Sequence, residues 1–171
     1  MTETLKEAAR AYEGSADRPL ASYGRILLVY SGVVGAVAAV AWLTGRRAPE
    51  KIGLLDLGLM GMFTHRLSRT LAKDPVVSPL RAPFTKYVGV SGPSELREEV
   101  RGSGLRHALG ELVSCPFCLS QWVATGYAAG MVFAPRVTRL AGATMTAVAA
   151  SDWLQLAYSR MMKQAGEDGP E

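Results

Sequence analysis

The sequence has few of the residues and motifs from which catalytic sites are commonly built. Its 171 residues include two cysteines and two histidines, and no nucleotide-binding glycine loop, GxSxG elbow or HExxH motif occurs. The sequence therefore gives no support to a hydrolase or a kinase. The 19 lysines and arginines exceed the 15 acidic residues, but aromatic and basic residues are not interleaved, so no nucleic-acid partner is expected.

Charge is missing from three long stretches. Residues 26–43 and 112–135 carry none, and residues 140–159 carry one charge, Asp152. A bilayer core about 30 Å thick needs roughly 20 helical residues at about 1.5 Å each. Helices of a soluble bundle keep a polar stripe facing water, and these stretches show none. They predict membrane spans.

A fourth segment, residues 52–72, is apolar at its start except for Asp56 and ends with His65, Arg66 and Arg69. One hypothesis is a second span whose arginines extend to the surface. The other is a helix that lies in the membrane interface. Spanning is favoured because it puts both chain ends on one face. The prediction is an all-α integral membrane protein with four transmembrane helices, or three plus one interfacial helix.

The chain divides into five predicted segments. They are a cytoplasmic N-terminal segment (1–22), a transmembrane helical hairpin (23–72), a cytoplasmic loop with short amphipathic helices (73–113), a second transmembrane hairpin (114–160) and a flexible tail (161–171). Within the loop, Ser94 is expected to cap a helix over Glu95–Arg101, and residues 105–113 to form a second helix.

The basic residues predict the orientation. With four spans, 14 lysines and arginines fall on the face that holds the termini and the long loop, and 5 on the other. The positive-inside rule then places both termini in the bacterial cytoplasm. That compartment keeps thiols reduced, so a permanent disulfide is not expected.

Both cysteines belong to one CxxC motif, Cys115-Pro116-Phe117-Cys118, at the expected start of a helix. Three hypotheses stay open. The pair is structural, with Ser114 or Cys115 as the helix cap. It is a redox pair, because a helix N-terminus favours the thiolate. Or it binds zinc, which needs four ligands, with His65 and His107 or a second chain supplying the rest. No other cofactor is expected.

Acids and small residues in the spans have functional interpretations of their own. Asp56 is an intramembrane acid, and a proton or ion pathway is one hypothesis for it. Asp152 is expected at a similar depth to the arginines of segment 52–72, where it pairs with Arg66 or Arg69. Gly126 and Gly130 form a GxxxG motif, which predicts close packing with a membrane-protein partner or a second copy.

Residues 65–87 and 110–124 resemble the family of domain of unknown function 1360, small bacterial integral membrane proteins. The matching patterns are R-x-x-R-x-x-x-x-D from Arg66, L-R-x-P-F from Leu80 and E-L-x-x-C-P-x-C-x-x-x-W from Glu111. The resemblance implies a membrane location and no particular activity. It also suggests one charge cluster at the cytoplasmic boundary, either a network of ion pairs or a site for anionic lipid headgroups. The residues that the resemblance places there are Arg66, Arg69, Asp74, Arg81, Glu111, Cys115 and Cys118, and Asp152 joins the charge cluster through its predicted ion pair.

Taken together, these features predict a non-enzymatic structural or interaction component of the bacterial cytoplasmic membrane. Its expected partners are the lipid bilayer and a membrane protein or second copy bound through Gly126 and Gly130. A thiol-redox or zinc-binding protein that uses Cys115 and Cys118 is the first alternative. A small transporter or ion pathway is the second.

Overall fold

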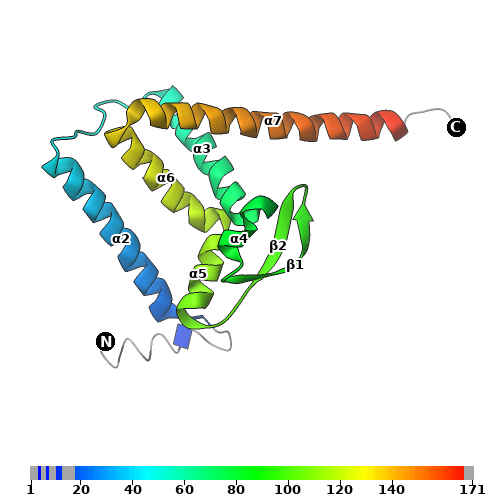
Figure 1. Ribbon diagram of the computed structural model, residues 1–171. Helices are drawn as coiled ribbons and strands as arrows, with labels where there is room; N and C mark the ends of the chain where they lie inside the picture. The colour runs from blue at the N-terminus through cyan, green and yellow to red at the C-terminus, as the bar shows by residue number, and fades with distance from the viewer. Residues whose placement is uncertain (1–3, 5–6, 8–10, 13–17, 168–171) are drawn as a thin grey trace.

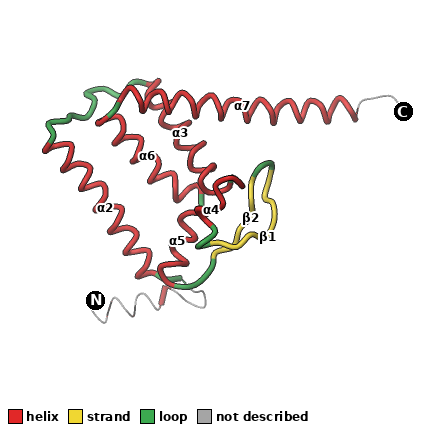
Figure 2. The backbone as a smooth tube through the Cα atoms, viewed as in Figure 1, coloured by secondary structure: helices red, strands yellow, loops and turns green. Residues whose placement is uncertain are grey.

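The computed structural model describes residues 4, 7, 11–12 and 18–167. Its described part is mostly helical and also contains a two-stranded sheet, so the all-α prediction is wrong in that detail (Figures 1 and 2). The long helices are α2 (Leu20–Leu43), α3 (Leu54–Lys73), α6 (Pro116–Phe133) and α7 (Pro135–Glu167). Between α3 and α6 lie η1 (Pro75–Val77), α4 (Ser78–Arg81), β1 (Thr85–Gly92), β2 (Glu95–Val100) and α5 (Gly104–Ser114).

Helix α2 is the one described helix that is long and apolar enough to cross a membrane by length and composition. It begins after Pro19 and ends at a glycine-terminated turn. Gly45 has φ +66° and its N–H donates to the Trp42 carbonyl, while the Arg46 N–H donates to the Ala41 carbonyl. This pair of hydrogen bonds is a Schellman motif, in which glycine adopts the left-handed conformation without a Cβ penalty.

The other three long helices form the packed centre. Helix α3 packs against both α6 and α7. The Phe63 and Tyr127 rings meet with centroids 5.0 Å apart, joining α3 to α6. A Cβ on Gly142 of α7 would lie 2.5 Å from Tyr127 Oη and 3.2 Å from Leu59 Cβ. The three helices therefore approach one another most closely where α7 has no side chain.

Helix α2 stands at the side of this centre (Figure 1). It contacts α5 at its N-terminal end and α6 around Tyr30. The Tyr30 and Trp122 rings pack edge to face with centroids 5.1 Å apart. Tyr30 Oη also lies 2.7 Å from Thr125 Oγ1 and accepts a hydrogen bond of 2.7 Å from Gln121 Nε2. Polar side chains thus link two otherwise apolar helices.

The helix predicted over Glu95–Arg101 is wrong, because this stretch is strand β2 of an antiparallel hairpin. Leu96, Glu98 and Val100 are partly buried, whereas Arg97 and Glu99 are exposed. This alternation has the period of a strand and overrides the helix propensity of the charged residues. Ser94, predicted to be a helix cap, has φ +57° and lies in the hairpin turn.

The second helix of the long loop is confirmed as α5. It packs closely on the hairpin at Gly110, where a Cβ would lie 2.5 Å from Val100 Cγ1 and 2.9 Å from the Phe84 carbonyl oxygen. The Arg106 guanidinium donates to the Pro83 carbonyl through Nε at 2.9 Å and Nη2 at 2.6 Å. Hairpin and α5 therefore form one small cap on the three-helix centre.

Helix α7 is longer than predicted. It continues through Glu167, so residues 161–167 are helical rather than a flexible tail, while residues 168–171 lie outside the described part. Met, Lys, Gln and Ala after residue 160 are all strong helix formers. The C-terminal half of α7 extends beyond the other helices (Figure 1). Most of the predicted N-terminal segment 1–22 also lies outside the described residues.

Candidate functional site

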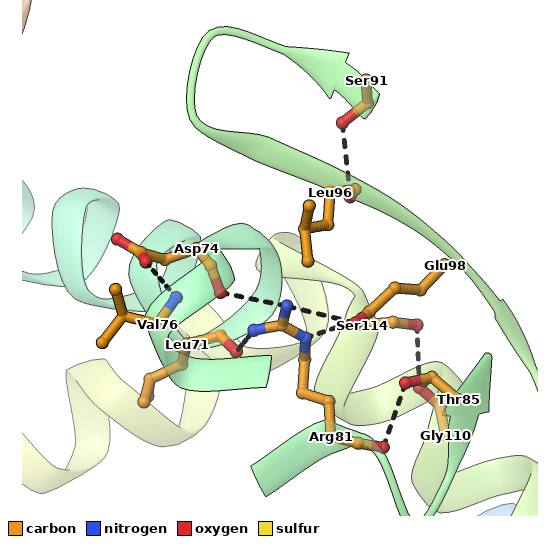
Figure 3. Close-up of polar contacts among 10 residues, drawn as sticks. All are labelled: Leu71, Asp74, Val76, Arg81, Thr85, Ser91, Leu96, Glu98, Gly110 and Ser114. Atoms are coloured by element: carbon orange, nitrogen blue, oxygen red, sulfur yellow. Dashed lines mark hydrogen bonds and ion pairs between the residues drawn. The ribbon is translucent and has the colours of Figure 1, made fainter. Parts of the chain in front are cut away.

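Among the residues that the structure describes, Arg81 is the most deeply buried large side chain, with 1% of its surface exposed. Its Nε donates to Glu98 Oε2 at 2.7 Å, and Nη2 lies 3.3 Å from Glu98 Oε1. Nη1 donates to the Leu71 carbonyl at 2.9 Å and Nη2 to the Asp74 carbonyl at 3.1 Å. Figure 3 shows how one guanidinium joins the end of α3 to strand β2.

The neighbours of Arg81 complete this joint. The Asp74 carboxylate accepts the Val76 N–H at 2.8 Å and so caps η1, while the Asp74 carbonyl accepts from Arg81. Thr85, also buried, donates its hydroxyl to the Arg81 carbonyl at 3.0 Å. Paired buried charges are costly to separate, because an ion left alone in a low-dielectric site has lost its water. Arg81 is therefore a structural residue that fixes the hairpin on the helices.

Two further ion pairs lie along α3. Arg66 Nε is 3.0 Å from Asp152 Oδ2 on α7. Its N–H does not point along that line, so the attraction is between charges rather than through an aligned hydrogen bond. Arg69 Nε donates to Glu95 Oε1 at 3.0 Å, at the hairpin turn. Of the two partners predicted for Asp152, the structure has Arg66.

Glu111 belongs to a separate group at the base of α2. Its carboxylate lies 2.7 Å from Arg18 Nη1, accepts a hydrogen bond from the Tyr23 hydroxyl, and lies 3.5 Å from His107 Nε2. The hydrogen bond with Tyr23 and the charge of Glu111 raise the pKa of the Arg18 guanidinium above its usual value. The predicted charge cluster is therefore two groups, one at the hairpin and one that joins α5 to α2.

Asp56 is paired at the other end of α3. Arg139 of α7 donates Nε to Oδ1 at 2.8 Å and Nη2 to Oδ2 at 3.1 Å, a bidentate arrangement. Arg139 was not recognised as its partner from the sequence. The signal was present, since the four-span topology puts the start of segment 52–72 and the turn at Ala134–Arg136 on the same face. In the described geometry, Asp56 is therefore paired with a basic side chain of α7.

The two cysteines are free thiols at the start of α6. Cys115 is the N-cap, and its Sγ accepts the Cys118 backbone N–H at 3.3 Å. Among the described residues, no three His, Cys, Asp or Glu side chains gather into a metal-binding group. His65 and His107 therefore do not complete a zinc site with this pair. The geometry is that of a helix cap.

The two glycines of the GxxxG motif have different surroundings. A Cβ on Gly130 would lie 2.5 Å from Thr138 Oγ1 of α7, so this glycine serves the close contact between α6 and α7 within the chain. A Cβ on Gly126 would meet nothing within 4 Å. Only the Gly126 side of the motif is open to another helix.

Two hollows border α3, and neither was predicted. A groove of about 510 Å³ runs between α3 and α6, and a cleft of about 1030 Å³ lies between α3, the hairpin turn and α7. Residues His65 and Arg69 line both. The lining of the cleft is more polar than that of the groove, and it carries most of the charged residues.

Fold and site define a mostly helical protein with one helix able to cross a membrane and a charged cap beside it. The chain belongs to the family described as "Protein of unknown function (DUF1360)", whose pattern matches residues 59–158. It is also similar to "Sporulation protein YjcA" of Bacillus subtilis (strain 168), at 33% identity over 73 residues. That alignment covers 41% of this chain and 62% of the relative, so the chain spans less than two thirds of the relative's length. No solved structure matches.

Proposed function

We propose that this chain is a four-span, non-enzymatic component of the bacterial cytoplasmic membrane, with both termini and the hairpin cap in the cytoplasm. It holds the cap rigidly at the membrane surface, where the cap and the open face of α6 are available to partners. Its small buried core is the observation that carries the proposal. Among the described residues, five apolar ones are buried: Ala72, Ala108, Tyr127, Met131 and Ala149.

Large apolar side chains instead cover the outside of all four long helices. Examples are Leu28 on α2, Leu55 on α3, Phe117 on α6 and Leu154 on α7, each more than two thirds exposed. Soluble monomers rarely expose so many large apolar side chains, because each exposed Å² forgoes about 25 cal/mol of burial. Lipid chains are the surroundings in which such a surface is stable.

The ion pairs support the same arrangement. Arg139–Asp56 lies at one end of the helical centre, and Arg66–Asp152, Arg69–Glu95 and Arg81–Glu98 lie towards the other. Charges near a membrane are tolerated when they are paired or extend to the interface. On α3, Asp56, Arg66 and Arg69 each have such a partner. The helix can therefore cross the bilayer although its sequence is not uniformly apolar.

A structural role also accounts for the cysteine and charged side chains that could otherwise indicate a catalytic or ion-conducting function. Cys115 caps α6, Asp56 is held by Arg139, and Arg81 and Glu98 neutralise each other. What is left exposed is strand β1, where Tyr87 and Val90 are 59% and 67% exposed. An exposed strand with apolar side chains is a surface to which a protein partner can add. We infer that the hairpin is the cytoplasmic contact surface.

Membrane fractionation tests the proposal. The full chain, expressed with a small tag in a bacterial host, is separated by ultracentrifugation before and after an alkaline carbonate wash. An integral protein stays in the pellet after the wash and is released by detergent. Recovery in the supernatant without detergent would overturn the proposal, since no lipid would then be needed to cover the helices.

A further inference from the structure

The groove between α3 and α6 is shaped for an apolar chain. Its lining includes Leu57, Met60, Phe117 and Ala124, and Gly61 forms an open floor where a Cβ would meet nothing within 4 Å. Among the described residues, the Thr64 hydroxyl in this groove has no hydrogen-bond partner although its oxygen is buried.

The cleft has the opposite character. Five basic side chains line it against three acidic ones, so it carries a surplus of positive charge: Arg66, Arg69, Lys73, Arg160 and Lys163 against Asp74, Glu95 and Asp152. Two of the arginines are already paired, but no ion pair involves Lys73 or Arg160 among the described residues. Ser91, Ser94 and Ser159 add hydroxyls to the lining. Cations and hydroxyl donors together are the groups that bind phosphate.

One ridge of α3 connects the two hollows. Leu57, Gly61, His65 and Arg69 follow at intervals of four residues and so lie on one face of the helix. The first two line the groove, and the last two line both groove and cleft. Twelve residues from Leu57 to Arg69 correspond to about 18 Å, close to one leaflet of a bilayer core about 30 Å thick.

We propose that the groove and cleft together bind one anionic phospholipid of the cytoplasmic leaflet. Its phosphate lies in the cleft near Lys73 and Arg160, and one acyl chain lies along the groove. This inference rests on the proposed membrane topology, which puts the basic end of α3 at the cytoplasmic, anionic surface. Trp153 lines the cleft and is half exposed, as an interfacial aromatic residue is. A second copy of the chain fits poorly, because it would bring the same positive cleft.

Lipid selectivity of the detergent-purified full chain tests this inference. Native mass spectrometry measures retention of phosphatidylglycerol against phosphatidylcholine with identical acyl chains. The wild type should retain phosphatidylglycerol preferentially. Lys73→Gln and Arg160→Gln should each lower that preference about fivefold, the effect expected of one basic side chain at an anionic surface. Arg46→Gln and Arg47→Gln, on the loop after α2, are matched charge controls and should leave it unchanged.

A second pair of variants tests the groove without altering charge. Gly61→Leu fills the groove and should release phosphatidylglycerol, whereas Gly58→Leu, on the same helix but outside the groove lining, should not. Equal retention of both lipids by the wild type would overturn the inference. So would displacement by inorganic phosphate combined with no effect of Gly61→Leu, which would indicate a site for free phosphate alone. Both results are distinct from failure of the proposed function, in which the chain leaves the membrane pellet.

Discussion

Arg81 and Glu98 form a buried ion pair whose partners come from α4 and β2, with Nε and Oε2 2.7 Å apart and both side chains at most 5% exposed. The same guanidinium reaches the carbonyls of Leu71 and Asp74. The guanidinium of Arg81 therefore joins the hairpin to the end of α3, alongside the Arg69–Glu95 pair at the hairpin turn. Its removal would leave Glu98 charged and unpaired between the hairpin and α3.

We expect Arg81→Met to weaken the attachment of the hairpin by about 3–5 kcal/mol, the usual cost of leaving one buried ion alone. Hydrogen exchange of the β1 and β2 amides in detergent measures this loss of stability. These amides should lose protection against exchange, while the amides of α6 should stay protected. Arg97→Met on the exposed face of β2 is the matched control. Unchanged protection in Arg81→Met would show that the pair does not hold the hairpin.

A double-mutant cycle tests the pair between α3 and α7. Arg66→Gln and Asp152→Asn should each destabilise the chain by about 1 kcal/mol or less, because both partners are partly exposed. The double variant should be no less stable than the less stable of the two single variants. Arg69→Gln should instead be additive with Asp152→Asn, since Arg69 pairs with Glu95. Thermal unfolding of purified protein gives the values, and coupling of Asp152 to Arg69 alone would contradict the assignment.

The cysteines give a test of the capping role. Cys115→Ala should lower stability by about 0.5–2 kcal/mol, while Cys115→Ser, which can still accept the Cys118 N–H, should lose much less. The Cys115→Ser/Cys118→Ser double variant should fold and enter the membrane normally. The zinc content of the purified wild type is measured as well, to test the alternative that the cysteines bind metal. Stoichiometric zinc that disappears in the double variant would establish a metal role instead.

The two glycines of α6 should respond differently to leucine. Gly130→Leu would collide with Thr138 and should cost about 1–3 kcal/mol, as overpacking does. Gly126→Leu has open space and should leave the unfolding temperature nearly unchanged. If Gly126 mediates contact with a second copy, the Gly126→Leu variant should show less self-association in crosslinking within membranes. Equal destabilisation by both substitutions would refute the assignment of Gly130 to the contact with α7.

Two local signals in the sequence support α2, α6 and α7, and both occur together in α6. Charge-free stretches cover most of α2 and α6, and Pro116 and Pro135 stand at the first positions of α6 and α7. The hairpin was missed for a physical reason. Glu95–Arg101 has a helix-forming composition, and only burial of Leu96, Glu98 and Val100 on one face favours a strand.

Pairing of charges was partly predictable. Depth along two predicted spans suggests Arg66 or Arg69 as the partner of Asp152, without deciding between them, and the structure has Arg66. The same argument applied to the opposite face suggests Arg139 with Asp56. Burial of Glu98 was not predictable, because it lies among Arg97, Glu99 and other charged residues with nothing local to mark it. The cleft forms because the hairpin turn lies beside α7. A sequence analysis that does not predict the hairpin therefore cannot predict the cleft.

The side of the membrane on which each loop lies tests the central claim most directly. In a Cys115→Ser/Cys118→Ser background, single cysteines are placed at the exposed positions Ala48, between α2 and α3, and Glu99, on the hairpin. Intact spheroplasts and inverted vesicles are treated with a membrane-impermeant maleimide. We predict that Ala48→Cys is labelled only in spheroplasts and Glu99→Cys only in inverted vesicles. Labelling of both cysteines from the same side would contradict a bilayer-spanning α3 and the topology that depends on it.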